Sequence, residues 1–169
     1  MTAWLFEIAT PTEPDVPEPP AGIAVRPFRS DDAHAAHRVA EDAFDEWQQR
    51  RLSFKEWATV TVERPAFVPA ASPVAFAGDE LVGVLIALDV SAGDEGYVDR
   101  IAVRRDQRGK GLARLLLRYT FREFHRQGKR CCTVWTHSDT GALGLYERVG
   151  MTVRRSSTFY AKKLEAATG

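Results

Sequence analysis

The stretch Val103-Arg-Arg-Asp-Gln-Arg-Gly-Lys-Gly-Leu-Ala113 joins a predicted strand directly to a predicted helix. Gly109 and Gly111 let the backbone turn tightly and bring N–H groups close to a ligand, and the new helix adds the positive end of its dipole. Arg108 and Lys110 add positive charge, so the stretch predicts a cradle for a pyrophosphate. The spacing is neither that of a Walker loop nor that of the Rossmann glycine motif. The alternative is that the glycines only make a tight turn.

A second informative stretch follows the next predicted strand and reads Asp139-Thr-Gly-Ala-Leu-Gly-Leu-Tyr-Glu-Arg-Val-Gly-Met151. Together the two stretches resemble the signatures of the GNAT superfamily of N-acetyltransferases. The first signature, R/Q-x-x-G-x-G/A, is matched by Arg108, Gly111 and Ala113. The second, N-x-x-A-x-x-L-Y-x-x-x-G-F, corresponds to Asp139, Ala142, Leu145, Tyr146 and Gly150. The resemblance covers about residues 23–164, and two motifs in the right order and spacing make it specific.

Two positions depart from the second signature. Met151 replaces a phenylalanine with another apolar side chain, whereas Asp139 replaces an asparagine, keeps the acceptor oxygens and loses the amide donor. Any cofactor contact made by that amide is therefore in question. The sequence of residues 141–148 is similar to that of actinobacterial members of the superfamily, including proteins with tandem repeats of the domain such as mycothiol synthase. In those, a strand and linker like residues 1–20 can be the tail of a preceding repeat.

Patterning predicts a mixed α/β (α+β) architecture with about seven strands. Alternation and apolar runs favour strands at 3–9, 23–28, 74–77, 81–90, 97–103 and 131–136, with a final pair within 151–164. Helix signals favour helices at 31–47, 53–62, 111–127 and 141–149. We expect helices on both faces of the sheet. The resemblance implies the GNAT fold, in which the central parallel strands 97–103 and 131–136 splay apart.

The chain has room for one compact domain, at 169 residues and 18.9 kDa. We expect residues 1–20 to be an N-terminal strand and a proline-rich connector, and residues 21–169 to be the acetyltransferase domain. The N-terminal strand has two candidate partners, the C-terminal strand pair or a second chain in a homodimer. The first residues lack a basic, apolar leader and no apolar run is long enough to span a membrane, which predicts a cytoplasmic protein without a membrane partner. Cys131 and Cys132 are expected to be reduced packing residues.

The formal net charge of zero conceals a segregation of charge along the chain. Residues 1–99 hold 7 basic and 18 acidic residues, whereas residues 100–130 hold 11 basic and 2 acidic ones. The basic segment contains the predicted pyrophosphate cradle, so we expect it to meet an anionic cofactor rather than nucleic acid. In this family the first two helices shape the acceptor site. Because they are acidic here, we expect a cationic acceptor such as an amine, an aminoglycoside or a peptide N-terminus.

The resemblance implies that acetyl-CoA binds between the splayed strands, without a metal. The residues it assigns to the cofactor are Ile101, Ala102, Val103, Arg108, Gly109, Lys110, Gly111, Leu112, Ala113, Arg114, Asp139 and Tyr146. Backbone N–H groups at 101–103 would polarise the thioester carbonyl as the amine attacks. The thiolate then needs a proton, and Tyr146 is the candidate general acid, because a tyrosine pKa of about 10 lies close to a thiol pKa of about 8.5.

Asp99 is the candidate general base that deprotonates the incoming amine, and a water chain is the alternative. Strand alternation predicts that its side chain shares a face with Tyr97 and Ile101. Asp99 could instead only pair with an arginine, and Tyr146 could only pack. Asp45 and Glu46 are weaker candidates for substrate contact.

Two further patterns have plain interpretations. Arginines at positions 114, 118, 122 and 126 form either a solvated helical stripe or, at its first turn, a contact to the CoA 3′-phosphate. His34 and His37 lack the accompanying ligands of a metal site, which favours packing or surface roles. The alternative to an enzyme is a non-catalytic module that binds acyl-CoA or a polyanion, which Asp139 and the basic segment would favour.

Overall fold

Seven strands form one mixed sheet in the computed structural model, which describes residues 1–45, 48, 50–90 and 93–160. Their order across the sheet is β2-β3-β4-β5-β6-β1-β7. The strand bounds are β1 Thr2–Ala9, β2 Ile23–Pro27, β3 Pro73–Ala77, β4 Glu80–Leu88, β5 Glu95–Val103, β6 Cys131–His137 and β7 Thr152–Thr158. The mixed sheet of about seven strands predicted from the sequence is thus confirmed.

Helices pack on both faces of this sheet, also as predicted. Helices α1 (Ala33–Phe44) and α2 (Phe54–Val60) share one apolar cluster with β3, β4 and β5. Helices α3 (Leu112–Arg126) and α4 (Leu143–Arg148) share the other cluster, which includes the buried side chains of β1 and β6. The capping box that predicted α2 is present, because Ser53 Oγ accepts from the Glu56 N–H and Glu56 accepts from the Ser53 N–H. Helix α1 ends at Phe44, and Trp47 lies outside the described residues.

The two halves of the sheet meet in a short parallel seam between β5 and β6. Only four residue pairs form it, from Glu95↔Cys131 to Val98↔Val134. Strand β5 runs on to Val103 and β6 to His137, so their ends diverge beyond the seam. On its other edge β5 stays paired with β4 as far as Gly83↔Val103. The splayed parallel pair implied by the family resemblance is therefore present.

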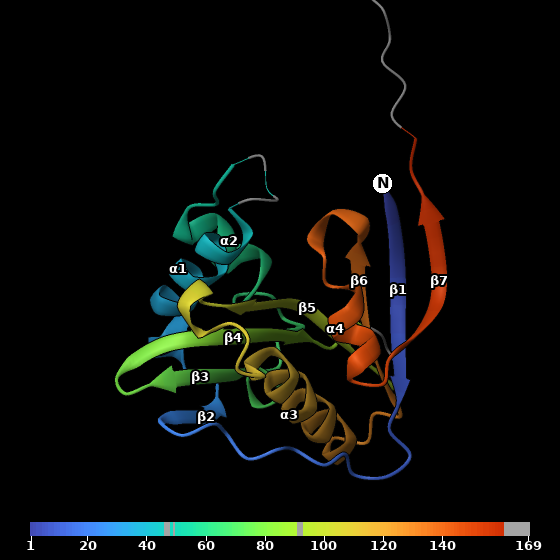
Figure 1. The fold of residues 1–169 in the computed structure, drawn as a ribbon, viewed down its shortest axis with the longest axis horizontal. Coiled ribbons are helices and arrows are strands. Elements are labelled where there is room, and N and C mark those ends of the chain that lie inside the picture. The colour runs from blue at the N-terminus through green and yellow to red at the C-terminus, as the bar shows by residue number, and fades with distance from the viewer. Residues whose placement is uncertain (46–47, 49, 91–92, 161–169) are drawn as a thin grey trace, which may run out of the picture.

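Strand β1 lies between β6 and β7 and pairs antiparallel with both (Figure 1). Of the candidate partners, the C-terminal segment of the same chain is the one it pairs with here, through β7. That segment supplies one strand within the described residues, β7, rather than the predicted pair, and residues 161–169 lie outside them. From β1 the connector of residues 10–22 passes along α3 to β2 (Figure 1). Arg118 donates to the Asp15 carbonyl and Arg126 pairs with Glu13, which hold the connector there.

Candidate active site

A cleft of about 350 Å³ opens where β5 and β6 diverge, and it has walls on both faces of the sheet. From the α3 and α4 side it is lined by Arg108, Ala113, Leu145 and Tyr146. From the α1 side it is lined by Ala43 and Phe44. The cleft is thus lined by residues from both faces of the sheet, and a transfer between two substrates requires room for a ligand on each side.

The glycine cradle forms a second cavity, of about 420 Å³, that shares lining residues with the cleft. Gly109 and Gly111 have φ values of 75° and 78°, a left-handed conformation that glycine adopts without strain. In the part of the chain that the structure describes, the N–H groups of Gly109, Lys110 and Gly111 have no hydrogen-bond partner. They precede the first turn of α3, so the loop offers a phosphate unpaired donors together with the positive end of the helix dipole. This geometry fits the pyrophosphate of a CoA ester.

The residues assigned to the cofactor from the sequence fall into three groups. Most of them line the two cavities: Ile101, Ala102, Val103, Arg108, Gly109, Gly111, Leu112, Ala113, Arg114 and Tyr146. Lys110 lines neither cavity, and its ammonium donates to Gln107 Oε1. Asp139 is exposed, accepts a hydrogen bond from Ser138 Oγ and also lines neither cavity.

The edge of β5 that faces the cleft offers N–H donors at alternate residues. The Arg104 N–H bonds to the Val82 carbonyl on β4, so the N–H groups of Ile101 and Val103 point to the opposite, open edge. Arg108 Nε donates to the Val103 carbonyl at 3.1 Å and fixes the loop against this edge. Two of the three predicted positions, Ile101 and Val103, can thus donate to an oxyanion, whereas Ala102 contributes its side chain to the wall.

Tyr146 is nearly fully buried, with 4% of its surface exposed, and lines the cleft from α4. Its ring packs on Phe6 of β1, with centroids 5.6 Å apart. Burial raises the pKa of the Tyr146 hydroxyl to about 12, and Tyr97 adds to the shift. The hydroxyl therefore stays protonated across the physiological range, which is the state a proton donor needs.

Asp99 lines the same cleft, but the sequence placed its neighbours wrongly. In the ladder with β4, Ile86 pairs with Arg100 and Ala87 with Val98, which leaves Asp99 as the extra residue of a β-bulge. The bulge interrupts the alternation, so Tyr97 packs in the α1–α2 cluster while Ile101 packs in the α3 cluster. The shared face predicted for Asp99, Tyr97 and Ile101 is therefore wrong.

The Asp99 carboxylate also has the electrostatics of a base. Burial raises its pKa, and the charges and hydrogen bond of nearby arginines act in the opposite direction without cancelling the increase. Arg100 Nε donates to Asp99 Oδ2 at 3.1 Å, so the predicted alternative, a salt bridge with an arginine, is present as well. Asp45 pairs with Arg51 beside a neighbouring cavity, and Glu46 lies outside the described residues.

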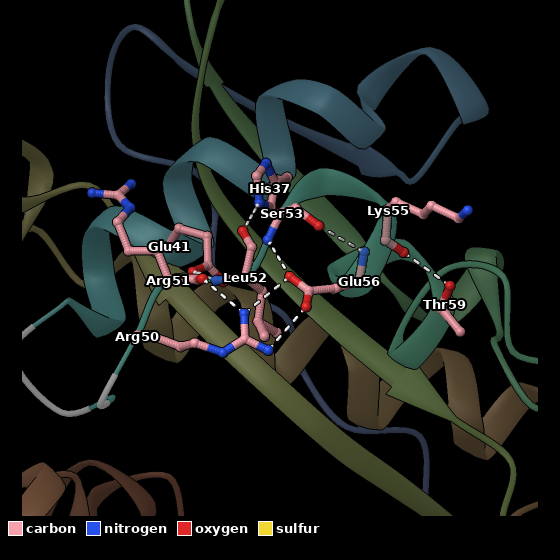
Figure 2. A network of polar contacts seen from close by, with 9 residues as sticks. All are labelled: His37, Glu41, Arg50, Arg51, Leu52, Ser53, Lys55, Glu56 and Thr59. Carbon is pink, nitrogen blue, oxygen red and sulfur yellow. Dashed lines mark hydrogen bonds and ion pairs between the residues drawn. The ribbon is translucent and has the colours of Figure 1, made fainter.

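A buried carboxylate ties α1 to the segment that leads into α2 (Figure 2). Glu41 is 1% exposed, and its Oε2 accepts hydrogen bonds from the Leu52 N–H at 2.7 Å and from Gln48 Nε2 at 2.9 Å. His37 Nε2 lies 2.8 Å from the Leu52 carbonyl, so both backbone groups of Leu52 are held (Figure 2). His34 stacks on Phe54, and the histidines of α1 thus have packing contacts.

Several residues of the basic segment pair with carboxylates of the acidic half. Ion pairs join Arg104 to Glu80, Arg126 to Glu13, Lys129 to Asp89 and Arg130 to Asp94. Two of the four arginines in the α3 stripe contact the connector, and only Arg114 lines the cradle. These ion pairs bring residues of the basic segment and of the acidic half together in the fold.

Four residues in or near the cleft were not predicted from the sequence. Arg100, Trp135 and His137 line the cleft, and the charge of Arg64 acts on Asp99. Trp135 and His137 alternate on β6 beyond the seam, a signal that the sequence offered. Arg64 lies in the segment after α2, where no pattern marked it.

The fold and this two-sided cleft define the class to which the chain belongs. The model of the acetyltransferase (GNAT) family matches residues 31–151, and the chain belongs to this family. The mycothiol acetyltransferase of Streptomyces scabiei is 29% identical, over 89% of this chain and 48% of that protein. The spore coat polysaccharide biosynthesis protein SpsD of Bacillus subtilis is 30% identical, over 76% of this chain and 40% of that protein.

Solved structures show the same relationship. A GCN5-related N-acetyltransferase from Sphaerobacter thermophilus superposes with a TM-score of 0.78 and 30% identity, over 92% of this chain and 49% of that chain. The chain thus spans about half the length of the relatives it matches. Within the described ranges, no helix has the length and apolar character needed to cross a membrane, and no three His, Cys, Asp or Glu side chains are grouped to hold a metal.

Proposed function

We propose that the protein is a cytoplasmic, acetyl-CoA-dependent N-acetyltransferase. Its acceptor is a primary amine that binds as a cation and whose nitrogen attacks the acetyl group directly. The observation that carries the proposal is the cleft across the sheet, with the unpaired donors of the cradle on one side and the Asp99 carboxylate in its wall. The name of the mycothiol acetyltransferase relative supports acetyl transfer. Acetyl-CoA would supply an activated acetyl thioester, held by the cradle.

Each residue then has a distinct task. The ammonium loses one proton to Asp99 before its nitrogen attacks the thioester carbonyl, and the N–H groups of Ile101 and Val103 stabilise the oxyanion. The C–N bond forms and the C–S bond breaks, and Tyr146 gives its proton to the departing thiolate. The second proton, which the nitrogen loses as it becomes an amide, is available to restore the Tyr146 hydroxyl, and the proton on Asp99 passes to solvent. The pKa of about 12 at Tyr146 exceeds that of a thiol in water, about 8.5. The same burial destabilises a thiolate in the cleft and raises the pKa of the corresponding thiol, which narrows the pKa difference between that thiol and Tyr146.

Release of free thiol from acetyl-CoA in the presence of a panel of amines tests this function. Tyr146→Phe should lower kcat by more than tenfold, and Asp99→Asn should lower kcat/KM most strongly below the pKa of the amine. Tyr160→Phe, at a side chain that is 91% exposed, and Asp79→Asn, in the exposed turn after β3, are the matched controls. Undiminished turnover in Tyr146→Phe would remove that residue from the mechanism.

The outcome for the whole panel separates the enzyme from a binding module. Thermal stabilisation by CoA without thiol release for any amine would favour an acyl-CoA-binding module. Salt-sensitive binding to nucleic acid without stabilisation by CoA would favour a polyanion-binding one. The contacts of Arg118 and Arg126 with the connector leave fewer free arginines for a polyanion.

A further inference from the structure

On the α1 side of the cleft, where we propose that the acceptor binds, the described charged groups that act on Asp99 are two arginines. Asp99 and Arg100 line the cleft and form an ion pair of 3.1 Å. Arg64 is half-buried in the segment between α2 and β3, which the bridge of Phe67 to Leu88 holds at the end of β4. Arg64 does not itself line the cleft, but its charge acts on Asp99 and Tyr97. Across the described residues, no hydrogen bond or ion pair holds the Arg64 guanidinium, although charged groups so placed are usually paired.

The other described carboxylates of this region do not line the cleft. Glu41, buried on α1, accepts hydrogen bonds from the Leu52 N–H and from Gln48 Nε2. Asp42 and Asp45, at the neighbouring cavity, both pair with Arg51. Glu63 is exposed and accepts a hydrogen bond from Thr59. Asp99 is thus the acidic residue that lines the cleft.

Binding of an amine makes this imbalance worse. The ammonium must use the Asp99 carboxylate, which is then shared between the ammonium and Arg100. One carboxylate would face three cations in a partly desolvated space, and such a set is unfavourable unless a further anion joins it.

His137 adds a further hydrogen-bond donor to the same wall. Its ring lines the cleft, while its Nδ1 is buried and lacks a hydrogen-bond partner among the described residues. A buried N–H without an acceptor is rarer than a buried lone pair without a donor, so in the neutral ring the proton belongs on Nε2. His137 then presents Nε2–H as a donor, which suits an anionic oxygen.

We propose that the acceptor carries an anionic group, a carboxylate or a phosphate, close to its primary amine, and that Arg64 and Arg100 bind this group. The inference rests on the proposed function and refines it: the acceptor is cationic at the reacting nitrogen and zwitterionic as a whole. On binding, the ammonium replaces Arg100 at Asp99, and the acceptor's anion replaces Asp99 at Arg100. His137 donates a further hydrogen bond to the anion.

Matched acceptor pairs that differ only in the anionic group test the proposal. Leucine against leucinamide tests a carboxylate, and glucosamine 6-phosphate against glucosamine tests a phosphate. We expect the anionic member of at least one pair to have a kcat/KM at least tenfold higher. Arg64→Gln and Arg100→Gln should each reduce that preference fivefold or more, mainly through KM, and Arg100→Lys should restore part of it. Arg38→Gln, at an exposed position on α1, removes the same charge and should leave the preference unchanged.

Binding measurements keep this test separate from that of the proposed function. Calorimetry of the same four compounds with the CoA-saturated protein gives the preference even when no acetyl group is transferred. Equal affinity within both pairs, or a preference that survives both glutamine variants, overturns the inference while leaving acetyl transfer intact. Absence of thiol release with every amine, together with a clear binding preference, overturns the enzyme and supports the site.

Discussion

The parallel seam between β5 and β6 has no room for a side chain at Gly96. A Cβ built there would lie 2.4, 2.5 and 2.6 Å from Cδ2, Cγ and Cε2 of Phe124. Carbon atoms in contact are normally about 3.5–4.0 Å apart, so the overlap is about an ångström. Phe124 is fully buried in the α3 cluster, and its ring cannot swing into solvent. The Gly96→Ala substitution must therefore displace either α3, which carries Phe124, or β5, which carries Gly96.

The expected cost follows from this overlap. Overpacking of a closed core costs about 1–3 kcal/mol, and the rigid ring places Gly96→Ala at the upper end. Urea unfolding followed by circular dichroism should show a lower midpoint with an unchanged m-value. The melting temperature should fall by about 2–4 °C for each kcal/mol. Since the seam has only four residue pairs, affinity for CoA should also fall, by fivefold or more.

Two comparisons make the prediction specific. Gly93→Ala, where a Cβ meets nothing within 4 Å, should change stability by no more than about 0.5 kcal/mol. In a Phe124→Leu background, Gly96→Ala should cost clearly less than in the wild type, because the smaller side chain can make room. Equal costs in both backgrounds, or a neutral Gly96→Ala, would refute the steric account.

Three further predictions concern other parts of the molecule. Phe6→Ala should lower the free energy of unfolding in urea by about 3–5 kcal/mol, because the ring is fully buried. It should also lower kcat more than it changes the KM for acetyl-CoA, because Phe6 packs against Tyr146. Burial raises the pKa of Asp32, but hydrogen bonds from Arg26 and the backbone outweigh burial and lower that pKa overall. The wild type should therefore be more stable than Asp32→Asn above about pH 4, and its advantage in unfolding free energy should shrink as the pH falls further. Burial raises the pKa of the Cys132 thiol far above its usual range, so a thiol reagent at pH 8 should modify it only after unfolding.

The sequence predicted the conformation of the glycine loop, because the determinants of that conformation are local. The glycines at 109 and 111 sit between a strand and a helix, and backbone conformation at such a junction follows from neighbouring residues alone. The same holds for Tyr146, which the second motif places on a short helix after β6. Helix and strand positions followed from capping residues and periodicity with small shifts at the ends.

The acceptor side depends on contacts between distant segments, which the sequence does not display. The bulge at Asp99 arises from the register between β4 and β5, and no residue in β5 marks it in advance. Arg64 comes within range of Asp99 only because the segment after α2 crosses the end of β4, through the bridge of Phe67 to Leu88. The charge segregation was real along the chain, yet folding paired many of the opposite charges.

The place of β1 in the sheet constrains the order in which the chain can fold. This strand precedes its partners β6 and β7 in the sequence by more than 100 residues, and Thr2 pairs with Thr158. The two hydrogen-bonding edges of β1 stay unpaired until β6 and β7 have been made, and contacts of such long sequence separation slow folding. Because Phe6 supports Tyr146, the candidate proton donor gains its support only in this last step. Until β6 and β7 have been made, the nascent chain thus carries an unpaired strand whose edges are open to wrong partners.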